Sequence, residues 1–81
     1  MLTELKTAKK VTGAKQVTRA LKNGAARRVF LAQDADPRVT EPIQMLCQEQ
    51  GVEIQSVDTM TALGAACGIA VGCAVCALLR G

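Results

Sequence analysis

Residues 27–33 read Arg27-Arg28-Val29-Phe30-Leu31-Ala32-Gln33, and this stretch decides the fold. It contains four consecutive apolar residues, whereas a strand with one face in water alternates apolar and polar side chains. A continuous apolar run indicates a strand covered on both faces, so we place it at the centre of a sheet. Helices on both sides of that sheet are then required.

Helix and strand patterns alternate on both sides of this central strand. We expect helices at residues 2–10, 14–23 and 40–50 and a short fourth helix capped by Asp58 or Thr59. We expect strands at residues 11–12, 27–33, 52–57 and about 72–79. Gly24 suits the left-handed end of the second helix, and Pro42 suits the first turn of the third. The pattern predicts an α/β fold, a three-layer α/β/α sandwich with a mixed sheet of about four strands, in a single domain over residues 1–81.

Basic residues are concentrated in the first part of the chain. The whole sequence carries ten Lys or Arg against seven Asp or Glu, a net charge of +3. Residues 1–30 hold eight bases and one acid and carry +7, whereas residues 31–81 hold two bases and six acids and carry −4. This asymmetry indicates a polyanionic partner met by one face, although a basic surface exposed only to water gives the same count.

Aromatic content limits the kind of polyanion. Phe30 is the only Phe, Tyr or Trp in the chain, and it lies inside the apolar run. RNA modules and single-strand binders that stack bases on exposed aromatic side chains are therefore excluded. Recognition of a structured nucleic acid remains.

The sequence offers no catalytic set. Histidine is absent, and the only close acidic pair is Asp34 with Asp36. Because Pro37 follows directly, we interpret both acids as turn and cap residues. Phosphate-cradling glycine motifs are also absent. We therefore expect no enzyme activity and no cofactor.

Four cysteines raise the question of a metal site or a disulfide, and Cys73 and Cys76 form a CxxC pair. If residues 73–79 form a strand, these two side chains point to opposite faces, which disfavours both a shared metal and a bridge. With Cys47 and Cys67, they are better read as small buried hydrophobes, and a zinc site stays open as a minor alternative. The sequence shows no secretory signal, so we expect a cytoplasmic protein.

An uncharged stretch runs from Ala62 to Leu79, with Gly64, Gly68 and Gly72 at every fourth position. This spacing is similar to that of a membrane helix with a glycine face. Much of the stretch is Ala, Gly and Cys, which makes insertion marginal. We expect a short helix, a loop and a buried strand instead, with no membrane contact, and a C-terminal membrane anchor remains the alternative.

The segment after Gly13 is the candidate binding element. A helix that starts there leaves backbone N–H groups free to attract phosphate oxygens. Lys15 and Arg19 lie on one side of this helix together with Lys22, opposite its apolar face, and Gln16 adds a polar group in the first turn. An ordinary amphipathic helix exposed to water has the same pattern.

Three ordered segments together resemble the L-seven-Ae ribosomal protein family. They read GAKQVTRA at 13–20, DADP at 34–37 and LGAACGIAV at 63–71. In length and in the Lys15-Gln16 pair, the chain is most similar to the short bacterial members of the YbxF type. The resemblance implies binding to kink-turn RNA, a helix bent at a bulge beside sheared G·A pairs. It also implies a protein that is ribosomal or associated with ribonucleoprotein, for which we expect a monomer.

The resemblance assigns roles to individual residues. It implies that Lys15, Gln16 and Arg19 face the G·A pairs and that Gly13 and Ala14 bring the backbone close to the RNA. It further implies that the loop before the last strand covers the unstacked bulge nucleotides with an apolar surface. The expected RNA-binding set is Gly13, Ala14, Lys15, Gln16, Arg19, Lys22, Ile69, Ala70 and Val71.

The chain departs from the archaeal pattern of this family. That pattern usually has Asn then Glu where this chain has Lys15 then Gln16, and often Glu in place of Ala70. Losing the carboxylate removes a charge-assisted acceptor for guanine, so specificity should be weaker and nonspecific attraction stronger. A second hypothesis is a protein-interaction adaptor of the same fold without specific RNA binding.

Overall fold

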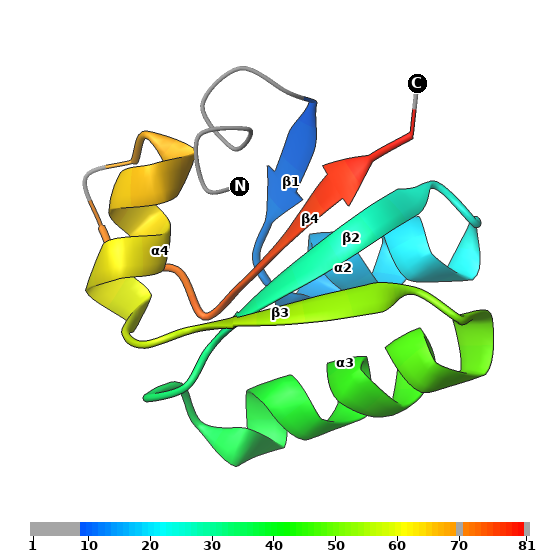
Figure 1. The fold of residues 1–81 in the computed structure, drawn as a ribbon, viewed down its shortest axis with the longest axis horizontal. Helices are drawn as coiled ribbons and strands as arrows, with labels where there is room; N and C mark the ends of the chain where they lie inside the picture. The colour runs from blue at the N-terminus through cyan, green and yellow to red at the C-terminus, as the bar shows by residue number, and fades with distance from the viewer. Residues whose placement is uncertain (1–8, 70, 81) are drawn as a thin grey trace.

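The computed structural model describes residues 9–69 and 71–80. Its elements in chain order are β1 (Lys10–Thr12), α2 (Ala14–Lys22), β2 (Ala26–Ala32), α3 (Pro37–Gln50), β3 (Glu53–Val57), α4 (Met60–Cys67) and β4 (Val75–Leu79). Helices α2 and α3 pack on one face of the sheet and α4 packs on the other (Figure 1). The predicted α/β/α sandwich is confirmed.

The sheet has four strands in the order β1-β4-β2-β3. Strand β2 runs antiparallel to β4 and parallel to β3, so the sheet is mixed, as predicted. In β2, Val29 packs in the cluster formed with α2 and α3, and Phe30 packs in the cluster formed with α4. Both side chains are fully buried. The continuous apolar run thus has the two-sided burial that the sequence indicated.

Helix α3 begins earlier than predicted. The Asp36 side chain accepts a hydrogen bond from the backbone N of Arg38 at 2.9 Å and caps the helix, and Pro37 takes the first helical position. Pro42 therefore lies inside the helix, and its placement in the first turn was wrong. The Asp36 carboxylate, and not Pro42, sets where the helix begins, because it pairs with an N–H that the helix start would leave without a partner.

The chain's first predicted helix lies almost entirely outside the described residues. Its expected end at Lys10 was wrong, because Lys10 opens strand β1 and pairs with Leu78 of β4. The predicted helix over 14–23 is confirmed within one residue. Gly24, which follows it, has a φ of 70°, in the left-handed region expected at the end of a helix.

Strand β4 is shorter than predicted, and this changes the reading of the cysteines. Because β4 starts only at Val75, Cys73 precedes the strand, and Cys73 and Cys76 join the same buried cluster. The expected opposite orientation was therefore wrong. The Cys67 thiol donates to the sulfur of Cys76 at 3.3 Å, and all four cysteines are buried and reduced.

The uncharged C-terminal stretch is not one helix. Its first part forms α4, which ends at Gly68 in a left-handed cap, and its last part forms β4. Across the described ranges 9–69 and 71–80, none of the helices has the length and hydropathy needed to cross a membrane.

Candidate nucleic-acid interface

Helix α2 starts from a glycine that is fixed to the sheet. Gly13 has a φ of 92°, in a region that favours glycine, and its N–H donates to the carbonyl of Val75 at 3.1 Å. Its own carbonyl accepts from Val17 N at 3.0 Å and begins the helix. No side chain among the described residues caps this end. The N–H groups of the first turn are therefore available to an anion.

The two faces of α2 separate as predicted. Val17, Ala20 and Leu21 are buried against the sheet and α3. The polar face is exposed and carries Lys15, Gln16, Arg19 and Lys22. The first turn contains no acidic residue, so the positive end of the helix dipole and the side chains act with the same sign.

The loop between α4 and β4 presents apolar side chains to solvent. Ile69 is 37% exposed and Val71 is 71% exposed. Ala70, which stands between them in the sequence, lies outside the described residues. Exposed apolar side chains on a loop are a suitable surface for unstacked bases, as long as the loop keeps its shape.

Backbone hydrogen bonds bring the start of α2 and this loop to the same end of the sheet. Gly13 bonds to Val75, the first residue of β4, and Ala74 accepts from Ala32 N at 2.9 Å. The loop leads directly into Ala74 and Val75. In Figure 1, β1 leads into α2 at the end of the sheet where β4 begins. Two predicted parts of the site, which are remote in sequence, thus lie at the same end of the sheet.

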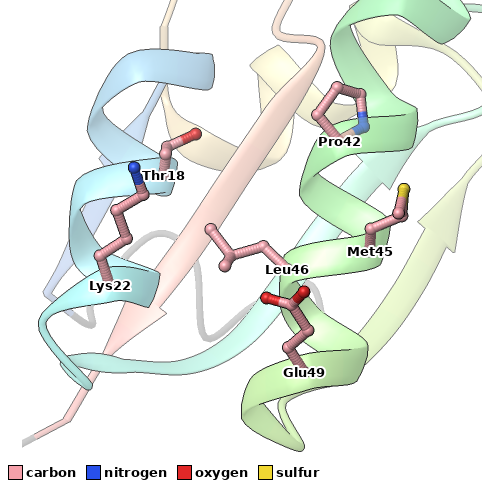
Figure 2. A pocket seen from close by; sticks show the side chains of 6 residues that line it. All are labelled: Thr18, Lys22, Pro42, Met45, Leu46 and Glu49. Carbon is pink, nitrogen blue, oxygen red and sulfur yellow. The ribbon is translucent and has the colours of Figure 1, made fainter.

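Lys22 differs from the other predicted residues. It shares the last turn of α2 with Arg19, but unlike Arg19 it lines, with Thr18, an open groove of about 330 Å³ between α2 and α3. Figure 2 shows these two side chains across from the α3 residues that complete the groove: Pro42, Met45, Leu46 and Glu49. Lys22 therefore lies at the opposite end of α2 from Gly13.

Sequence reasoning missed two residues near the loop. Met60, the first residue of α4, is 36% exposed and lies against Gly72. Asp34, interpreted as a turn or cap residue without an assigned partner, accepts a hydrogen bond from Met60 N at 2.8 Å. No local pattern reveals this bond, because it joins residues 26 positions apart.

Comparison with known proteins places the chain in a family. The model of the ribosomal protein L7Ae/L30e/S12e/Gadd45 family matches residues 2–80. The chain belongs to this family. Among its family relatives, RNA-binding protein YbxF of Geobacillus stearothermophilus is 45% identical over 76 residues, covering 94% of this chain and 93% of that protein. An RNA-binding protein of Bacillus pumilus is 45% identical over 69 residues, which is 85% of this chain and 84% of that one.

Solved structures of similar fold agree with this membership. The Giardia lamblia 15.5kD RNA binding protein superposes with a TM-score of 0.90 at 27% identity, covering 99% of this chain and 71% of that one. A Bacillus halodurans protein of unknown function superposes with a TM-score of 0.88 at 25% identity, covering 99% and 84%. The described residues therefore have the fold of this family.

Proposed function

We propose that this protein binds RNA and that its target is kink-turn RNA. The observation that carries the proposal is that the uncapped start of α2 and a loop with exposed apolar side chains lie at the same end of the sheet. Family membership supports it, as do the names of the relatives, several of which are called RNA-binding proteins. The protein acts by binding and not by catalysis.

The two parts of the surface serve different parts of the RNA. The N–H groups at the start of α2, with Lys15 and Arg19, attract phosphates, and Gln16 can both donate to and accept from base edges. Ile69 and Val71 cover unstacked bases through apolar contact. This replaces aromatic stacking, which the chain cannot provide because its only aromatic residue is buried.

Such binding selects a bent RNA from its ensemble. An RNA with a bulge interconverts between extended and bent forms, and a protein that fits only the bent form shifts the population toward it. The binding free energy offsets the repulsion between phosphates brought close at the bend. We extend the proposal to a monomer acting in cytoplasmic ribonucleoprotein, with ribosomal RNA among its candidate targets.

The test compares affinities for a kink-turn RNA and for a duplex in which the G·A pairs and the bulge are replaced by Watson–Crick pairs. Wild type should prefer the kink-turn. Arg19→Ala should weaken binding and reduce the slope of log K against log salt by about 0.7 to 0.9, the value for one lost phosphate contact. Arg80→Ala removes the same charge beyond the end of β4 and serves as the matched control. Equal affinity of wild type for the two RNAs would refute kink-turn recognition.

The adaptor hypothesis has one specific observation in its favour. Met45 is 64% exposed and lines the groove between α2 and α3 together with Pro42 and Leu46, and adjoining apolar side chains rimmed by polar ones mark protein contacts. The RNA affinity of the Arg19→Ala variant distinguishes the two hypotheses. RNA affinity that survives this change favours the adaptor, and steep loss of affinity favours RNA binding.

A further inference from the structure

The apolar loop is docked directly on helix α4. Ile69 N donates to the carbonyl of Gly64 at 3.0 Å, and Cys73 N donates to the carbonyl of Met60 at 3.0 Å. Between these bonds, Val71 passes so close to Gly64 that a Cβ there would overlap its carbonyl oxygen. Both ends of the loop are thus hydrogen-bonded to α4, and its middle touches the helix backbone. The loop must therefore follow any displacement of α4.

Helix α4 in turn is held at its start by two acceptors of different origin. The Thr59 hydroxyl accepts from Ala62 N at 3.0 Å, a local cap within the same segment. The Asp34 carboxylate accepts from Met60 N at 2.8 Å and comes from the turn after β2. A cap from a distant segment fixes where a helix lies, whereas a local cap only keeps it helical.

The turn that carries Asp34 is itself firmly placed. Gln33 N donates to the carbonyl of Val57 at 2.8 Å, and Ala35 N donates to the carbonyl of Ala32 at 3.2 Å. These bonds fix the turn to the ends of β2, a central strand, and β3, the edge strand beside it. The Asp34 carboxylate is therefore a fixed point relative to the sheet and to the start of α2.

We propose that Asp34 is a positioning residue for RNA recognition. Its carboxylate holds Met60 N, Met60 O holds Cys73 N, and this chain of bonds sets the position of Val71 relative to α2. Asp34 itself need not contact RNA. An ionised carboxylate suits the task because its bond to a helix N-terminal N–H is charge-assisted. The inference rests on the proposed function, since it assigns Asp34 to the apolar half of that surface.

The test uses Asp34→Ala and Asp34→Asn, with Thr59→Ala as the matched control. Asp34→Ala should weaken kink-turn binding about fivefold to tenfold, because the loop loses its place and its apolar contact. Asp34→Asn retains an acceptor oxygen and should bind within about twofold of wild type. Thr59→Ala removes a cap from the same helix, and it too should stay within about twofold despite lower thermal stability.

A double-mutant cycle with Val71→Ala separates positioning from general destabilisation. If Asp34 acts through the loop, Asp34→Ala should cost little further affinity once Val71 is already Ala. The proposal is overturned if Asp34→Ala binds like wild type, if its effect persists in full on the Val71→Ala background, or if Thr59→Ala weakens binding equally. Should Asp34→Ala fail to fold, Asp34→Ser, whose side chain is one bond shorter than that of Asp, takes its place under the same criteria.

The outcome for wild type separates the two proposals. If wild type does not prefer the kink-turn over the duplex, the proposed function fails, and the role of Asp34 falls with it. If wild type shows the preference and Asp34→Ala shows it unchanged, only the role of Asp34 fails.

Discussion

Replacing Val71 with alanine isolates the apolar part of the proposed RNA contact. Val71 is the most exposed large apolar side chain among the described residues, at 71%. The substitution keeps the backbone that docks on Gly64 and removes only side-chain carbons. Because those carbons lie mostly in solvent, the free energy of unfolding should change little.

The expected loss of affinity follows from that exposure. Burying one methylene-sized group yields about 0.8 kcal/mol, and Val71→Ala removes two such groups. Because Val71 as a residue is 71% exposed and that share of its surface is available for burial, the loss on binding is about 1.1 kcal/mol, or about sixfold in Kd. RNA that lacks the bulge should show no such loss, because it offers no unstacked base to the loop.

The assay is a direct titration of labelled RNA at fixed salt, with urea unfolding measured on the same preparations. Met45→Ala is the matched control, because Met45 is also exposed and apolar, at 64%, but lies on α3 at the groove between α2 and α3. It should leave RNA affinity unchanged. The reasoning is refuted if Val71→Ala binds the kink-turn like wild type, or if Met45→Ala weakens binding as much.

Three further predictions concern specificity, packing and pH. Changing Lys15 and Gln16 to Asn and Glu should sharpen discrimination between a kink-turn and a duplex without G·A pairs; equal discrimination in both proteins would count against the assigned roles. Gly64→Ala should lower the free energy of unfolding by about 1 to 3 kcal/mol, because its Cβ meets the Val71 carbonyl, whereas Ala65→Ser on the exposed side should be neutral in urea titrations. Burial raises the pKa of the Cys76 thiol, and so does its contact with Cys67. As the pH rises, the unfolded chain therefore loses this proton at a lower pH than the folded chain does. The contribution of this thiol to the free energy of unfolding is fully present below about pH 8. Above that pH it falls by at most about 1.4 kcal/mol per pH unit, and Cys76→Ala should reduce this slope in urea unfolding at pH 8 and 10.

Where local chemistry decides a structure, the sequence was sufficient to predict it. The apolar run in β2 predicted a central strand, because only two-sided burial explains it. Gly13 and Gly24 predicted the limits of α2, and both adopt the positive φ that glycine tolerates. The buried and exposed faces of α2 also followed from its periodicity alone.

The errors arose where two local signals compete or where a boundary shifts. Pro42 and Pro37 both suit a first helical turn, and the capping bond of Asp36 decided for Pro37. The assignment of Cys73 and Cys76 to opposite faces assumed a strand from residue 73, and the start of β4 at Val75 removed that premise. When the start of a strand moves by two residues, a prediction of which sheet face each side chain points to can be reversed.

The candidate site depends on bonds that no local pattern can reveal. The bonds from Gly13 to Val75 and from Asp34 to Met60 each join segments far apart in the sequence, and together they place the start of α2 and the apolar loop at one sheet end. The side chains proposed to touch RNA are exposed, whereas the groups that position them are hydrogen-bonded within the fold. Truncation to alanine of Lys15, Arg19 or Val71 should therefore cost affinity without stability, and alanine at Asp34 or Gly64 should cost both. Measuring stability and affinity on the same variants consequently sorts contact residues from positioning residues, without a structure of the complex.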